Sequence, residues 1–191
     1  MHRIVSIAIF SFALCGICFA QPLSNIEEPM DPSLRLTHED LNSGTAPYPF
    51  ESSLNECIRE DILKHEIGSS CVSEFFKFCP ESEPGEFLHA RMRCSGFGTR
   101  YWQTRLDDAL GELMRVYDEQ DHALLGRTHR ALIAQDINQK WAAWRDASCE
   151  FEQLKNPHFL GRAFLDVTLC EYRLTANRAL EVEYLIRVTN Y

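Results

Sequence analysis

The hydrophobic positions in the second half of the chain recur at the spacing of α-helices. From residue 99 onward, apolar residues repeat every three to four positions in three successive segments. Thr99 is a candidate N-cap for the first segment, whose apolar positions are Trp102, Leu106, Ala109, Leu110, Leu113 and Tyr117. Gly126 ends or interrupts this helix, and a second helix is expected from Thr128. After a turn at 156–161, a third helix is expected over 162–188.

The residues before 99 predict shorter elements. Ser53 and Glu56 have the S-x-x-E spacing of a capping box and precede a helical pattern that ends at Gly68, with apolar positions at Leu54, Ile58, Ile62 and Ile67. Prolines and glycines interrupt residues 79–98, which should hold at most a short helix at about 85–94. Since no segment shows sustained strand alternation, the fold class is expected to be all-α.

The first 50 residues differ in composition from the rest. A basic start and the apolar run from Ile4 to Ala20 are typical of a secretory signal peptide over residues 1–20, cleaved before Gln21. An uncleaved membrane anchor is the alternative, but the run is short for a span and no later segment looks transmembrane. Residues 21–50 carry five prolines without apolar periodicity and predict a flexible arm. The helical domain is then expected over residues 51–191.

Six of the eight cysteines lie outside the apolar start, and an even number in an exported chain predicts three disulfides. Six cysteines allow fifteen pairings. Our hypothesis pairs neighbours along the chain: Cys57–Cys71, Cys79–Cys94 and Cys149–Cys170. A metal site is disfavoured, because there is no C-x-x-C and no histidine at ligand spacing from a cysteine pair. The expected architecture is therefore a small disulfide-stapled bundle of three longer helices plus one or two short N-terminal helices.

The stretch KWAAWRDASC, residues 140–149, lies on the second long helix. At 100° per residue, Trp141, Trp144 and Arg145 share one face, which predicts that both tryptophans are in the core and that the arginine is at its edge, while Asp146 points away. A Cys149–Cys170 bond between antiparallel helices places the turn at 159–160 and brings Trp141 level with Arg178. We expect Arg178 to stack on Trp141, with Glu181 or Asn177 available to a guanidinium. This reading makes the stretch a structural joint, with a direct partner-binding role as the alternative.

The sequence resembles the LprI-type lysozyme-inhibitor family of exported bacterial proteins from about Cys57 to Leu185. The strongest motif is W-x-x-x-R-D-x-x-C, met by Trp141, Arg145, Asp146 and Cys149. Further matches are Cys94 ahead of Trp102, Leu106, Leu113 and Met114, the later Cys170, and the ending Thr175, Ala176, Arg178, Ala179 and Leu180. The resemblance implies a small, helical, exported protein. This chain departs from the family at Asn138, Asp107, Leu110 and the loop between the last two cysteines.

Charge and motifs bear on function. The formal net charge is −9, and it becomes −10 if residues 1–20 are removed, because they hold Arg3 and no acid. Such a chain is unsuited to nucleic acid or anionic lipid and would attract cationic partners, although acidity can also serve solubility alone. With all six cysteines paired and no nucleophile elbow, we expect no enzyme, no cofactor and no metal. His122 and His129 read as surface or cap residues.

Two binding hypotheses remain at this level. The first is inhibition of a cationic muramidase such as a lysozyme, by a periplasmic or secreted chain that does not insert in the membrane after signal cleavage. The second is a periplasmic interaction module with another envelope partner. Candidate contacts are the residues least like core, in the acidic segment before the first long helix and in the 152–162 turn: Glu81, Glu83, Glu86, Lys155 and His158.

Overall fold

The structure is a computed structural model, and it describes residues 31–43, 48, 50–63, 69–81, 85–123, 129–155 and 158–189. The expected signal peptide, Glu83 and Gly68 lie outside this part of the chain. The described residues form helices and no strand: η1 (Pro32–Leu34), α1 (His38–Ser43), α2 (Glu51–Leu63), α3 (Ser69–Glu74), η2 (Phe75–Phe78), α4 (Phe87–Ala123), α5 (Arg130–Glu152), η3 (Gln153–Lys155) and α6 (Leu160–Thr189). The predicted all-α class, with three long helices, is confirmed.

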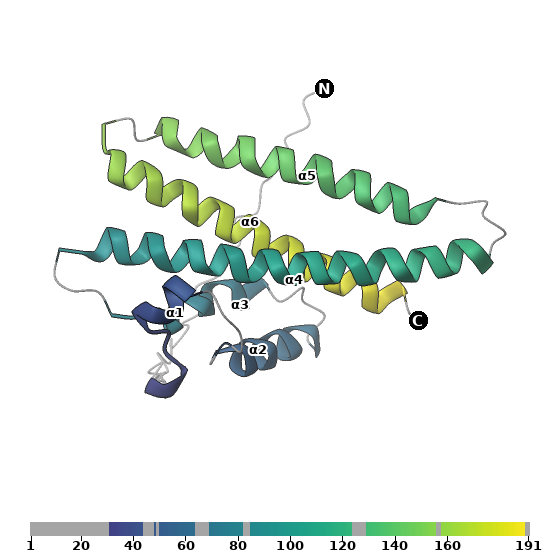
Figure 1. Ribbon diagram of the computed structural model, residues 1–191, viewed down its shortest axis with the longest axis horizontal. Coiled ribbons are helices and arrows are strands. Elements are labelled where there is room, and N and C mark those ends of the chain that lie inside the picture. Colours follow the sequence, from purple (N-terminus) through teal and green to yellow (C-terminus); the bar gives the residue numbers. More distant parts are fainter. Residues whose placement is uncertain are drawn as a thin grey trace, which may run out of the picture.

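The three long helices form a bundle, and the short N-terminal helices cover one side of it. Figure 1 shows α5 on one side of α4 and α6, and α1, α2 and α3 on the opposite side of α4. The core lies between α4, α6 and the short helices, around the fully buried Trp102, Phe75 and Tyr172. The Trp102 indole N–H donates to the Tyr172 hydroxyl over 3.4 Å, and that hydroxyl donates to the carbonyl of Val72 on α3. Burial raises the pKa of Tyr172.

Helix α4 is longer than predicted. We expected at most a short helix before residue 95 and a new one capped by Thr99, whereas α4 runs unbroken for 37 residues through Gly96 and Gly98. The Thr99 hydroxyl does not cap a helix end and donates instead to the carbonyl of Ser95, one turn back. Gly98 is present because a side chain there would collide with Tyr172 and Phe75, so tertiary packing accounts for a residue that sequence reasoning took as a break.

The expectation of a flexible arm up to residue 50 does not hold for the described residues of that stretch. Leu36, Leu41 and Phe50 are buried in the core, and the Leu36 N–H donates to the Phe78 carbonyl over 2.7 Å. These few apolar residues pack the segment against η2 and α4. The sequence did not reveal this, because the prolines interrupt any helical repeat of apolar positions. Thr37 and Asp40 form a capping box at α1, each side chain accepting from the backbone N–H of the other at 3.1 and 2.7 Å.

The capping box that the sequence predicted at Ser53 and Glu56 does not start α2. Helix α2 begins at Glu51, so Ser53 already lies in its first turn. The Leu54 N–H donates to the carbonyl of Phe50 at 3.0 Å, which shows that Phe50 and not Ser53 starts the helical hydrogen bonding. The buried ring of Phe50, which packs against Phe75, Phe78 and Tyr101, sets this start point.

The structure contains the three disulfides of our hypothesis. The Cα–Cα distances are 5.8 Å for Cys57–Cys71, 6.0 Å for Cys79–Cys94 and 5.4 Å for Cys149–Cys170. They join α2 to α3, the end of η2 to α4, and α5 to α6. Each staple therefore connects two elements that are neighbours along the chain.

Candidate functional site

The joint predicted from the KWAAWRDASC stretch exists between α5 and α6. The Arg178 guanidinium carbon lies 5.8 Å from the Trp141 ring centroid, and that of Arg145 lies 5.2 Å from it, so two cations contact one indole. Arg178 also pairs with Glu181 at 2.6 Å. The expected stacking of Arg178 on Trp141 is confirmed, and Glu181 is its partner.

Arg145 connects all three long helices. Its side chain is 17% exposed and donates to Gln103 on α4 at 3.0 Å and to Thr175 on α6 at 3.2 Å. It also pairs with Asp146, whose own side chain is exposed as expected. Gln103 was missed at the sequence level, because nothing in its spacing marks it as an arginine partner. These contacts place the motif residues Trp141, Arg145 and Arg178 in the joint between the long helices, and Trp102 is buried in the core.

Trp144 is not in the core, contrary to the sequence prediction. Its residue is 55% exposed, and Cys149 alone is buried among the 23 residues of α5. Because its disulfide joins Cys149 to α6, the side of α5 that carries Cys149 faces the bundle. Trp144 lies about 140° around the helix axis from Cys149. The face of α5 that packs on the bundle is therefore narrower than the spacing of its apolar residues predicted.

The four predicted partner-binding residues that the structure describes lie toward one end of the bundle, but they do not form a single charged surface. The start of α4 and the α5–α6 turn meet there: a side chain at Gly161 would lie 3.9 Å from Leu88 (Figure 1). Glu81 pairs with Arg35, whose hydrogen bond lowers the pKa of that carboxyl, and Lys155 pairs with Glu152 at 2.7 Å. Glu86 and His158 are exposed. Around them is an apolar end surface formed by Phe87, Leu88, Phe159, Leu160 and Phe164.

A different surface concentrates negative charge. A hollow of about 440 Å³ opens between α2, α4 and α6, and four carboxylates and one guanidinium line it together with polar and apolar neighbours. The charged residues are Glu51, Asp108, Glu112, Glu183 and Arg105. We call this the acidic hollow. Sequence reasoning missed it, because Glu51 and Glu183 are far in the chain from Asp108 and Glu112 and join them only when α2 packs beside α4 and α6.

Arg105 organises the floor of the acidic hollow. It forms a bidentate pair with Glu183 on α6 and donates to Asn55 on α2 at 2.7 Å. Burial acts to lower the pKa of Arg105, but the hydrogen bond and the charge of Glu183 outweigh burial and raise it. The guanidinium is therefore a fixed cation that neutralises one carboxylate. Glu112 pairs with Arg115 at 2.6 Å, whereas no cation among the described residues pairs with Glu51 or Asp108.

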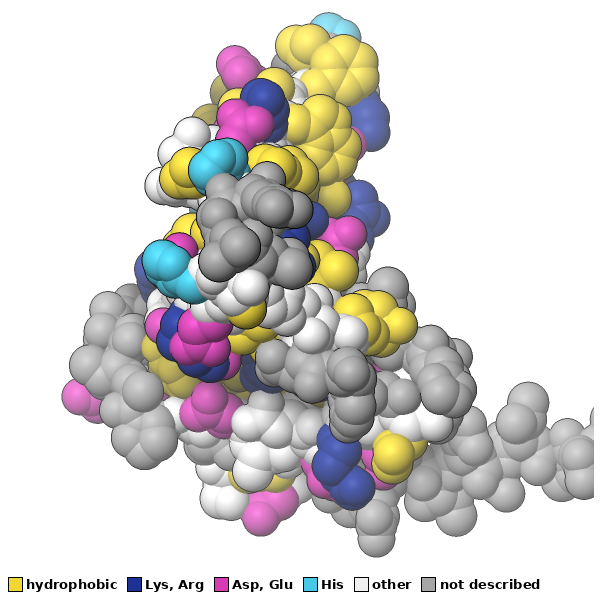
Figure 2. Space-filling model, turned by 90° about the vertical axis from the view of Figure 1, so that its right-hand side faces the viewer, with side chains coloured by type: hydrophobic (Ala, Val, Ile, Leu, Met, Phe, Trp, Pro, Cys, Tyr) yellow, Lys and Arg dark blue, Asp and Glu magenta, His cyan; other side chains and the backbone are white. Residues whose placement is uncertain are grey.

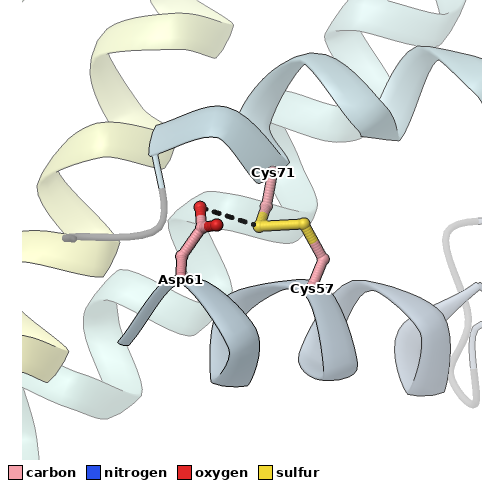
Figure 3. A group of neighbouring side chains, drawn as sticks. All are labelled: Cys57, Asp61 and Cys71. Carbon is pink, nitrogen blue, oxygen red and sulfur yellow. Dashed lines mark hydrogen bonds between the residues drawn. A yellow bond between two sulfur atoms is a disulfide. The ribbon is translucent and has the colours of Figure 1, made fainter. Parts of the chain in front are cut away.

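Cys57, Asp61 and Cys71 form the one group of potential metal ligands within the described residues (Figure 3). The two sulfurs are bonded to each other, so neither is a thiolate ligand in the oxidised protein. The buried Asp61 accepts a hydrogen bond from the Ser70 hydroxyl, and its carboxylate lies 3.4 Å from the Cys71 sulfur. We interpret Asp61 and Ser70 as polar neighbours that pack around the disulfide between α2 and α3.

The sequence profile of the family described as lysozyme inhibitor LprI matches residues 85–182. The chain belongs to this family. The match begins just before α4 and reaches into the last third of α6, so it includes Trp102 and the whole α5–α6 joint. No curated protein and no solved structure matches the chain. None of the helices in the described part of the chain combines the length and hydrophobicity needed to cross a membrane.

Proposed function

We propose that this LprI-family protein is an exported, non-catalytic inhibitor that binds a cationic muramidase in the periplasm or outside the cell. Family membership supports the inhibitor role, and three disulfides suit an oxidising compartment. The formal charge of −9 favours encounter with a basic enzyme.

The acidic hollow is the observation that carries this proposal. Of its four lining acids, Glu183 pairs with Arg105 and Glu112 pairs with Arg115, so Glu51 and Asp108 are left for the cations of a partner. An arginine or lysine of a basic partner can enter a hollow of about 440 Å³ and pair with Asp108 or Glu51. Inhibition then needs no chemistry from this chain, because a bound protein blocks the enzyme's substrate cleft by occupying it.

Replacing Asp108 by Lys tests the acidic hollow as the contact surface. Binding to an immobilised basic animal-type lysozyme should weaken at least about tenfold, because the new cation meets the cations of the partner. Asp118→Lys is the matched control, since Asp118 is exposed on the same helix but does not line the hollow. Both variants change the net charge equally, so equal weakening would reject the hollow and leave only general charge steering.

Salt provides an independent check of the same proposal. Charge-driven binding of the unmodified protein should weaken steeply as ionic strength rises toward physiological values. Salt-independent binding would instead favour the apolar end surface.

That apolar end surface supports a second candidate function, an interaction module for another envelope protein. Its five exposed side chains, Phe87, Leu88, Phe159, Leu160 and Phe164, form an apolar cluster of the kind that marks protein interfaces. The predicted contacts Glu81, Glu86, Lys155 and His158 would form its polar rim. Phe159→Asp should abolish such binding and leave lysozyme binding through the acidic hollow intact.

A further inference from the structure

Helix α5 and the η3 turn that follows it carry a second apolar stripe, whose large side chains are about half exposed or more in the described part of the chain. Five large side chains form it and are between 49% and 68% exposed: Ile133, Ile137, Trp144 and Phe151 on α5, and Leu154 on η3. Ile133 and Ile137 also border a hollow that α4 and α6 line from the other side. Figure 2 shows hydrophobic side chains gathered in the upper part of the molecule, which α5 and the first turns of α6 form. By contrast, the buried residues of α4 extend from Ala90 to Asp121, and those of α6 extend from Ala163 to Val182. Among the three long helices, α5 is therefore the one whose large apolar side chains are mostly exposed.

The spacing of this stripe is that of a coiled-coil seam. Together with Lys140 and Ala147, the five residues follow steps of four, three, four, three, four and three along the chain. This is the alternation of a and d positions over three heptads, and it specifies a second helix as the covering element. A single lysine at a seam position is a known device for fixing register and partner number. An unstructured peptide or a flat protein surface would not require this period.

The exposed area is sufficient for a dimer. Each of the five side chains leaves about 100 Å² of apolar surface uncovered, which gives about 500 Å² per chain. A standard protein interface buries about 800 Å² on each partner, of which a little over half is apolar. The stripe therefore supplies the apolar part of one standard interface without any contribution from the acidic hollow.

We propose that the protein forms a symmetric homodimer in which α5 pairs antiparallel with α5 of a second copy. A parallel pair would place Lys140 against its own copy and align the two helix dipoles, and both effects are unfavourable. In the antiparallel pair, with the midpoint of the stripe on the two-fold axis, Lys140 comes level with Ala147 of the second copy. Trp144 then lies beside the axis and contributes to the interface from both subunits. Such an isologous contact closes the assembly at two subunits.

The mass of the oxidised protein in solution tests the proposal. Sedimentation equilibrium from about 1 to 100 µM should give the mass of two chains, and Trp144→Glu should weaken dimerisation at least about 100-fold. Gln135→Glu is the matched control, because it puts the same charge on the same helix away from the stripe. Circular dichroism and melting verify that both variants fold. A monomer throughout this range, or equal effects of the two variants, would overturn the proposal.

The antiparallel register has its own test at Ala147. Ala147→Glu places a carboxylate opposite Lys140 of the second copy, whereas Ala147→Lys places a like charge there. The Glu variant should dimerise at least about tenfold more tightly than the Lys variant. In a parallel pair residue 147 would face itself, so equal weakening by both substitutions would reject the antiparallel arrangement.

Discussion

At the scale of single residues, Gly98 determines how closely α4 approaches its neighbours. A β-carbon there would lie 2.6 Å from a Tyr172 ring carbon and 2.7 Å from one of Phe75. Both rings are buried, and the Tyr172 hydroxyl is held by hydrogen bonds, so neither can move without cost. Helix propensity alone would favour alanine at this position.

Gly98→Ala should therefore destabilise the protein by about 1–3 kcal/mol, because overpacking outweighs the gain in helix propensity. Gly111→Ala is the control on the same helix, since no atom lies within 4 Å of its added carbon. That variant should be about 0.5–1 kcal/mol more stable than the unmodified protein. Urea unfolding of the two variants gives the comparison, and a stabilised Gly98→Ala would contradict the packing described here.

A second residue-scale effect concerns Asp40 and pH. The backbone N–H of Thr37, and then its hydroxyl, lower the pKa of the Asp40 carboxyl below its usual 3.8. A lowered folded-state pKa means that the contribution to stability is complete above about pH 4 and is lost as pH falls through the folded-state value. The protection of the Leu41 amide against hydrogen exchange should therefore be constant above about pH 4 and fall as the pH drops below it. Asp40→Asn should remove this pH dependence, and an unchanged dependence would exclude Asp40 as its source.

At the scale of elements, the α5–α6 hairpin depends on its staple. Helix α5 buries Cys149 alone, so packing holds it less firmly than the disulfide and the contacts of Arg145 do. The sequence predicted this hairpin well. The midpoint between Cys149 and Cys170 coincides with the predicted turn that contains Pro157 and Gly161, so both features indicate the same pairing of residues on the two helices. It did not predict the unbroken α4 or the packed segment before residue 51, because both depend on contacts with residues far along the chain: Gly98 lies against the Tyr172 ring, and the Leu36 N–H donates to the Phe78 carbonyl.

Replacing Cys149 by Ser should lower the free energy of unfolding by about 3 kcal/mol, the loss expected when a closure of this length is opened. The double variant Cys149→Ser, Cys170→Ser should show a similar loss, which separates the missing bond from any effect of a free thiol. Thermal melting measures both. An unchanged melting temperature would mean that packing, and not the staple, holds α5 in place.

At the scale of the whole molecule, the all-α class, the disulfides and the family could be predicted from the sequence, whereas the acidic hollow could not. Glu51, Asp108 and Glu183 lie on three helices, and only the packing of α2 against α4 and α6 brings them together. Local periodicity contains no information about that packing. The acidic segment that sequence reasoning chose instead places Glu81 against Arg35, beside an apolar end surface.

We propose that this LprI-family chain blocks a basic muramidase without doing chemistry of its own. The most direct test is the rate at which a basic animal-type lysozyme clears a peptidoglycan suspension, measured with increasing amounts of the purified oxidised protein at low salt. We expect the protein to slow clearance in a way that depends on dose and saturates. The slowing should be weaker with Asp108→Lys than with Asp118→Lys. Clearance at an unchanged rate with micromolar protein present would contradict it.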